Sequence, residues 1–86
     1  MAQQTVTIKN MSFDPKKIMV KAGDEIIWKN TMPMNHTATA NDGSFDTGVI
    51  QGNHSSKPIR FEQANPSIKY RCTIHPVMTG EIEVTP

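Results

Sequence analysis

The sequence predicts an all-β fold, a β-sandwich of seven or eight strands built from a single domain over residues 1–86. Short runs alternate between apolar and polar residues, which is the pattern of half-buried strands. Turn-forming residues separate these runs at short intervals, as they do in sandwiches and small barrels. No window of the chain has the apolar period of an amphipathic helix. We therefore expect an antiparallel sandwich that could hold a metal at one end, between loops.

The first two predicted strands lie before residue 22. Val6 and Ile8 alternate with polar neighbours in one run, and Ile18 and Val20 do so in a second run after Pro15. Because successive side chains of a strand point to opposite faces, each pair is expected to point into the core.

The middle of the chain contains one long and one short predicted strand. A turn at 22–24 precedes a strand over 25–30, in which Ile26 and Trp28 share one face. A short strand is predicted over 36–40, and turn residues follow it. The last three strands are predicted near residues 59–61, 68–72 and 82–84. The expected inward residues of the whole sandwich are Val6, Ile8, Phe13, Ile18, Val20, Ile26, Trp28, Phe45, Ile59, Phe61, Ile68, Tyr70, Ile82 and Val84.

Charge and composition exclude several classes of protein. Nine basic residues against eight acidic ones give a formal charge of +1, without a long block of one sign, so we expect neither nucleic acid nor an anionic membrane as a partner. A single cysteine excludes an intramolecular disulfide. No apolar run approaches membrane-spanning length, and the polar residues 1–4 do not resemble a signal peptide. We therefore expect a mature form or a domain excised from a longer chain.

The most informative segment lies between the last two predicted strands. Cys72, His75 and Met78 follow one another at intervals of three residues, and together they offer a thiolate, an imidazole and a thioether. Soft ligands of this kind favour copper. Pro76 disfavours a helical conformation at His75 and so favours a loop. Such a loop at a sheet end can direct all three side chains at one point.

A fourth ligand is expected from upstream in the chain, and His36 at the start of the short predicted strand is the best candidate. His36, His75 and Cys72 would supply two nitrogens and a sulfur, and Met78 would supply a weak axial sulfur. This set describes a blue-copper electron-transfer site.

These segments resemble the small cupredoxins of the plastocyanin and amicyanin family. The run from Cys72 to Gly80, with two residues between His75 and Met78, is similar to the short copper loop of amicyanin. The runs 36–48 and 20–30 also resemble plastocyanin-like domains. The resemblance implies a Greek-key cupredoxin sandwich with one type 1 copper, an electron carrier and not an enzyme, located in the periplasm or otherwise outside the cytoplasm.

The resemblance also identifies residues around the ligands. In plastocyanin-like relatives, an asparagine or serine after the upstream histidine bonds across to the cysteine loop, and Thr37 has a hydroxyl for that role. Relatives commonly place a proline before this histidine, where this chain has Asn35.

Other functions fit the sequence less well. A copper carrier or buffer could use the same four ligands and is the main alternative. A Cys–His hydrolase would need a third orienting residue and a substrate cleft, and neither is evident in so small a chain. A copper oxidase would normally need an open coordination position or more copper, whereas Met78 would close this site. Structural zinc sites normally use Cys and His alone. Met32 and Met34 could form a second soft-metal site but are expected to form apolar surface, and no role is expected for His54 in its polar turn.

The expected partners are redox proteins that dock transiently on a monomer. Neither the run 31–41 nor the run 72–80 contains a charged residue. If the two runs meet around the copper, they create an apolar patch beside the exposed edge of His75, of the kind that marks partner sites on small monomers. The residues of this patch are Met32, Pro33, Met34, Ile74, Pro76 and Val77.

Overall fold

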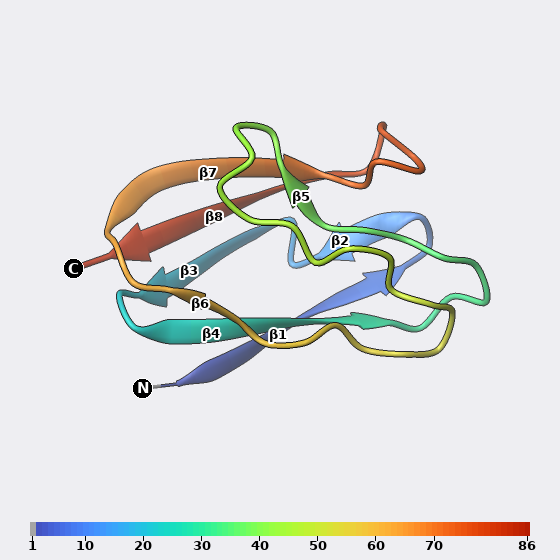
Figure 1. The fold of residues 1–86 in the computed structure, drawn as a ribbon, viewed down its shortest axis with the longest axis horizontal. Helices are drawn as coiled ribbons and strands as arrows, with labels where there is room; N and C mark the ends of the chain where they lie inside the picture. The colour runs from blue at the N-terminus through green and yellow to red at the C-terminus, as the bar shows by residue number, and fades with distance from the viewer. Residues whose placement is uncertain (1) are drawn as a thin grey trace.

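The computed structural model describes residues 2–86, which form two stacked four-stranded sheets (Figure 1). Eight strands are present within these residues, and no helix long and apolar enough to cross a membrane occurs among them. The strands are β1 Gln3–Lys9, β2 Ser12–Asp14, β3 Lys17–Lys21, β4 Asp24–Asn30, β5 Thr39–Ala40, β6 Ile59–Phe61, β7 Asn65–Arg71 and β8 Thr79–Thr85.

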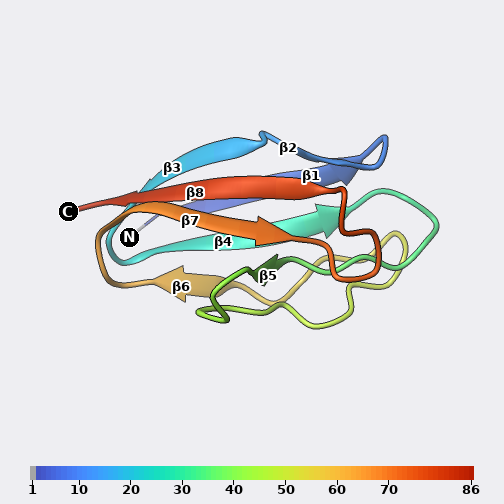
Figure 2. The same cartoon turned by 90° about the horizontal axis from the view of Figure 1, so that it is seen from above.

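The first sheet has the order β2-β1-β4-β6 and the second the order β3-β8-β7-β5. Figure 2 looks onto the second sheet, whose four strands lie side by side above the first sheet. The all-β sandwich is confirmed, but the antiparallel expectation is wrong for two strand pairs. β1 runs parallel to β4, and β3 runs parallel to β8. Apolar alternation has the same period in both pairings, so it could not distinguish them.

The core follows the alternation of the sequence. β8 alternates between buried and partly buried residues, and β4 buries Ile26 and Trp28 completely. Ile59 is the exception among the predicted core residues, because it is only partly buried against the core from its position on the edge strand β6. Ile50, which has no alternating neighbours, is buried as well.

Aromatic side chains fill the space between the sheets. The ring of Tyr70 packs against Phe13 and Trp28, with centroids 4.7 and 5.6 Å away. The indole Nε1–H of Trp28 donates to the hydroxyl of Tyr70 over 3.3 Å, and burial raises the pKa of Tyr70 to about 12. Gly80 lies opposite Tyr70 in the β7–β8 pair, where a Cβ would come within 2.3 Å of the Tyr70 ring. This close contact explains why position 80 is a glycine.

Asp24 joins the N-terminal segment to the β3–β4 turn. Its carboxylate accepts the backbone N–H groups of Ala2 and Lys21, each over 2.9 Å. The hydrogen bond from Ala2, followed by the one from Lys21, holds the pKa of Asp24 below its usual value of 3.8.

We expect Asp24→Asn to destabilise the fold at neutral pH and to have little effect in acid. A group whose pKa is lowered by folding stabilises the fold above its unfolded-state pKa, and this contribution is lost as the pH falls through the lowered value. Urea unfolding of the apoprotein at pH 7 and at about pH 2–3 measures the difference. A destabilisation that stays constant between the two pH values would contradict this account.

The metal-ligand candidates lie at one end of the sandwich. β4 ends at Asn30, β7 ends at Arg71 and β8 begins at Thr79, so the loops 31–38 and 72–78 both emerge at this end (Figure 1). The long connection from β5 to β6 also passes there, and its Ile50 pairs with His36. Three segments that are distant in the sequence therefore meet at one point.

Candidate metal centre

The loop 72–78 is a compact turn between β7 and β8. The N–H of Cys72 donates to the carbonyl of Met78 over 3.0 Å, and the N–H of Met78 donates to the carbonyl of His75 over 2.9 Å. Cys72 and Met78 are buried, with 0% and 2% of their surface exposed, whereas His75 is partly exposed. The loop is thus fixed by its own backbone.

His36 is held from the other side by the β5–β6 connection. Its N–H donates to the carbonyl of Ile50 over 3.1 Å, and the N–H of Ile50 donates back to the carbonyl of His36 over 2.7 Å. The strand predicted over 36–40 is shorter than expected, since only Thr39–Ala40 pairs with β7. His36 instead pairs with Ile50 through an isolated bridge. Its side chain is fully buried.

Asn30 organises the loop that carries His36. Its side-chain NH₂ donates to the carbonyls of Met34, Ile50 and Gln51 over 2.8, 3.1 and 3.3 Å, and its Oδ1 accepts the N–H of Met32 over 3.0 Å. Asn30 is only 1% exposed. Sequence reasoning missed this residue, because an asparagine at a strand end is typical of a turn.

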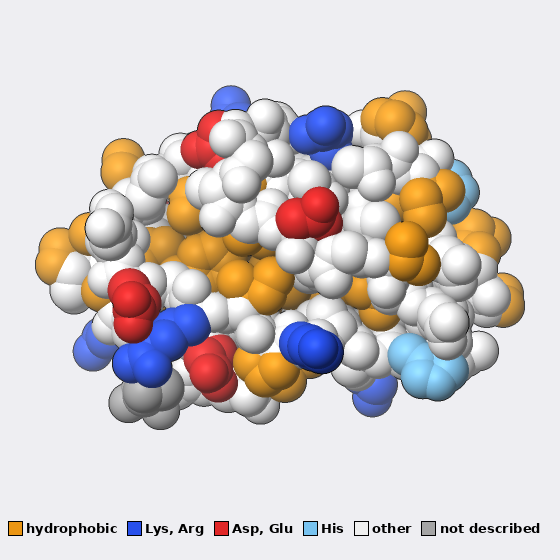
Figure 3. Space-filling model, in the orientation of Figure 1, with side chains coloured by type: hydrophobic (Ala, Val, Ile, Leu, Met, Phe, Trp, Pro, Cys, Tyr) orange, Lys and Arg blue, Asp and Glu red, His pale blue; other side chains and the backbone are white. Residues whose placement is uncertain are grey.

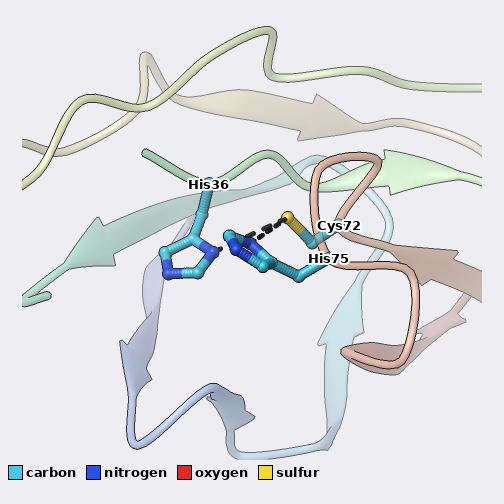
Figure 4. A group of neighbouring side chains, drawn as sticks. All are labelled: His36, Cys72 and His75. Atoms are coloured by element: carbon cyan, nitrogen blue, oxygen red, sulfur yellow. Dashed lines mark hydrogen bonds between the residues drawn. The ribbon is translucent and has the colours of Figure 1, made fainter. Parts of the chain in front are cut away.

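The three predicted nitrogen and sulfur donors converge (Figure 4). The Sγ of Cys72 lies 3.6 Å from Nδ1 of His36 and 3.9 Å from Nδ1 of His75. The two imidazole rings lie 4.9 Å apart at a tilt of 52°. Ligand atoms of all three residues fall within 4.8 Å of one another. A single ion could therefore contact all of them.

Thr37 connects the two loops beside this cluster. Its N–H points at the Sγ of Cys72 over 3.4 Å. Its hydroxyl oxygen accepts the N–H of Thr73 over 2.9 Å and lies 3.0 Å from the hydroxyl of Thr73. The hydroxyl therefore bonds across to the cysteine loop, as the plastocyanin resemblance predicts. The N–H directed at sulfur stabilises negative charge on the thiolate form.

Burial prepares His36 to act as a neutral ligand. Burial lowers the pKa of His36, and the nearby imidazole of His75 lowers it further. The Nδ1 atom faces the thiol, while Nε2 is buried and has no hydrogen-bond partner among the described residues. The protonated imidazolium is thus disfavoured, which keeps a nitrogen lone pair available to a metal.

The structure also describes the surroundings of Met32, Met34 and His54. Met32 turns its sulfur toward the N–H of Met11 over 3.4 Å, while Met34 is 40% exposed. The Nδ1 of His54 lies 2.8 Å from the carbonyl of Gly52 in an exposed turn. His54 does not belong to the cluster of His36, Cys72 and His75 found among the described residues.

The surface around the cluster is apolar. Val77 is 89% exposed, Ile74 is 46% exposed, and Pro33 and Pro76 are exposed as well. Hydrophobic and histidine side chains mark this end of the molecule on the face drawn in Figure 3, and no lysine, arginine, aspartate or glutamate lies at its tip. The six residues of the predicted apolar patch are therefore at the surface, with Met32 the most covered.

A β-sandwich with a buried thiol, two imidazoles and a thioether-bearing loop at one end defines a small copper protein. The family described as copper binding proteins, plastocyanin/azurin family, matches residues 1–85, and the chain belongs to this family. Copper is accordingly its cofactor, and the cluster provides one site for it among the described residues.

Known relatives agree with this assignment. Amicyanin from Paracoccus versutus is 30% identical over 83 residues, which cover 92% of this chain and 62% of that protein. The chain therefore spans less than two thirds of this relative. The structure of a Cu(I) amicyanin mutant is similar with a TM-score of 0.83 at 25% identity, over 93% of this chain and 79% of that one. A copper-containing nitrite reductase from Thermus scotoductus reaches 0.86 at 25% identity, over 95% of this chain but 22% of that one.

Proposed function

We propose that the protein is a mononuclear blue-copper electron carrier. The ligands are Nδ1 of His36, Sγ of Cys72 and Nδ1 of His75, with the thioether of Met78 as a fourth, weaker donor. Two imidazoles, a thiolate and a long methionine contact are the donor set of blue-copper sites. Bound copper supplies a one-electron Cu(II)/Cu(I) couple at this point.

The convergence of His36, Cys72 and His75 carries the proposal. The three donor atoms come from two loops that are 36 residues apart at their first ligands, yet they face one another within 4.8 Å. Structural zinc sites use four Cys or His ligands, and this cluster offers three such residues. The donor chemistry therefore fits copper better than zinc.

The protein's own residues restrict rearrangement around the donors. The Ile50 bridge holds the backbone of His36, the Cys72–Met78 hydrogen bond closes the loop, and Thr37 joins the loops to each other. Donor atoms fixed in this way need little movement when the charge at the site changes. Small movement lowers the barrier to electron transfer, which is the property that an electron carrier needs.

His75 and the patch around it form the proposed exit for electrons. His75 is the partly exposed ligand candidate, and its neighbours Ile74, Pro76 and Val77 are exposed. We propose that these three residues form one apolar patch with Met32, Pro33 and Met34. Weak redox encounters use small interfaces, which permits rapid exchange of partners. We propose that redox proteins dock here on a monomer. We also propose a location outside the cytoplasm, as the resemblance to amicyanin and plastocyanin implies.

The test is to cycle the copper-loaded protein repeatedly between its oxidised and reduced forms by voltammetry. We expect one reversible one-electron couple and one copper per chain after many cycles, even with a Cu(I) chelator in solution. His75→Ala should abolish the reversible couple, whereas His54→Ala, a matched change at an exposed histidine outside the cluster, should preserve it.

Release of Cu(I) to the chelator at the first reduction would reject the electron carrier. It would support the copper carrier, which uses the same ligands but must surrender the metal. Affinity for Cu(I) and the rate of its transfer to an acceptor would then be the quantities to measure.

A further inference from the structure

The outer face of the second sheet carries a group of basic side chains next to the metal cluster. Lys17 on β3 and Lys69 on β7 flank Glu81 on β8, since both are its register partners. Arg71 lies two residues beyond Lys69 and opposite Thr79. Figure 2 shows β3, β8 and β7 side by side, and the inward residues Ile68 and Tyr70 require the alternate residues of β7 to point outward.

Three of the basic side chains line a hollow of about 420 Å³, together with one acidic residue and four uncharged ones. The lining residues are Lys16, Lys17, Asn41, Lys69, Tyr70, Thr79, Gly80 and Glu81. Lys16, Lys17 and Lys69 are exposed, and Arg71 is partly exposed. We call Lys16, Lys17, Lys69 and Arg71 the basic face.

The positive charge of the basic face is not neutralised by ion pairs. Within residues 2–86 the ion pairs join Lys9 to Asp14 and Arg60 to Glu62, so none involves the basic face. Arg71 donates to the neutral Oδ1 of Asn41 over 3.0 Å, and Glu81 accepts the hydroxyl of Ser67 over 2.8 Å.

The charge is also unevenly distributed over the molecule. Four cations against Glu81 give this region a net charge of +3, whereas the whole chain carries only +1. Glu83 lies farther along β8, opposite Met19 and away from the metal cluster. The rest of the molecule is therefore net negative, and the field of the protein points an acidic partner toward this face.

The basic face begins directly beside two of the proposed ligands. Arg71 precedes Cys72, and Thr79 follows Met78. A partner on this face would thus lie over the strand ends that carry the thiolate. Val77 of the apolar patch and Lys16 of the basic face line one hollow, so a single docked protein could cover both surfaces.

We propose that the basic face docks an acidic redox protein and steers it to the metal centre. This inference rests on the proposed electron-carrier function. Opposite charges raise association rates and make them sensitive to salt, whereas the apolar patch alone would give little salt dependence. Continuity with the apolar patch favours a protein as the occupant over a nucleic acid, which needs a longer cationic track.

The test compares two double charge reversals in the copper-loaded protein. Lys16→Glu/Lys69→Glu changes the basic face, and Lys29→Glu/Lys57→Glu makes the same change in net charge at exposed lysines elsewhere. Stopped-flow spectroscopy follows electron transfer with the acidic haem domain of cytochrome b5 and with basic cytochrome c. Ionic strengths of about 0.01 M and about 1 M bracket weak and strong screening.

For the acidic probe at low salt, we expect the basic-face variant to react at least about 10-fold more slowly than the matched variant. The difference should disappear at high salt, and the basic probe should not show the same preference. Equal effects of the two variants, or a wild-type rate that does not depend on salt, would overturn the proposal. Tight binding to phosphatidylserine vesicles, lost in the basic-face variant, would replace it by a membrane function.

Voltammetry of the same variants separates this proposal from the proposed function. A reversible couple in all variants combined with indifference to the charge reversals would reject the docking face alone. Absence of a reversible couple in the wild-type protein would reject the electron-carrier function first.

Discussion

Cys72→Ser is expected to abolish the intense visible absorption of the copper-loaded protein while leaving the fold intact. The absorption of such sites arises from the copper–thiolate bond, and a serine hydroxyl is a harder and far less ionised donor. Cys72 is the single cysteine of the chain, so no other thiol can take its place. Its side chain is fully buried. Visible and EPR spectra after adding Cu(II) to the apoprotein measure the change.

Cys72→Ser should weaken copper binding more than the loss of a residue that only orients a ligand. Loss of a partner that orients a ligand typically lowers metal affinity about 10- to 100-fold, and Cys72 is itself a proposed ligand. We expect a weaker site with an ordinary tetragonal copper spectrum in the variant, and an unchanged spectrum in His54→Ala. Serine occupies nearly the volume of cysteine, so thermal unfolding of the apoprotein should change little. An intense thiolate band that survives in Cys72→Ser would falsify the assignment.

Alternation and ligand spacing made much of this structure predictable. A strand that buries every second residue is visible in the sequence, as Ile82 and Val84 show in β8. The approach of Cys72 to His75 was predictable for a different reason, since the two residues are three positions apart and need only a tight turn to bring their donor atoms together. The role of Met78 as a fourth ligand stays a prediction. His36 could be paired with that loop because only two histidines precede Cys72, and the other, His54, lies in a polar turn.

Other features depend on which segments meet in space. The parallel pairing of β1 with β4 leaves no mark on the apolar period, and the bridge that holds His36 depends on the isolated apolar residue Ile50. The basic face combines lysines near residue 16 with charges near residue 70, so a search for charge blocks along the chain cannot find it. Each of these features requires knowledge of tertiary neighbours.

Among the residues whose role depends on tertiary neighbours, Asn30 is the one whose substitution should destabilise the protein most. Asn30→Ala should lower the free energy of unfolding by about 3 kcal/mol, because the carbonyl of Met34 and the N–H of Met32 lose their partner and a buried amide that ties three segments together is removed. The side chain of Asn30 donates to the carbonyls of Met34 and Ile50 and accepts the N–H of Met32. It is almost completely buried. Urea unfolding of the apoprotein measures this loss.

The same substitution should weaken the metal site without removing a ligand. His36 keeps its backbone bridge to Ile50, but the loop between Asn30 and His36 loses the side chain that ties it to that connection. We therefore expect copper to dissociate about 10-fold faster into a chelator, with the visible band still present. Asn35→Ala is the matched control, because exposed Asn35 makes a single long bond to the N–H of Gly52 at 3.3 Å. The free energy of unfolding of Asn35→Ala should stay within about 0.5 kcal/mol of the wild-type value. If both variants lost stability and copper equally, the loop would be held by its backbone alone, and Asn30 would not organise the site.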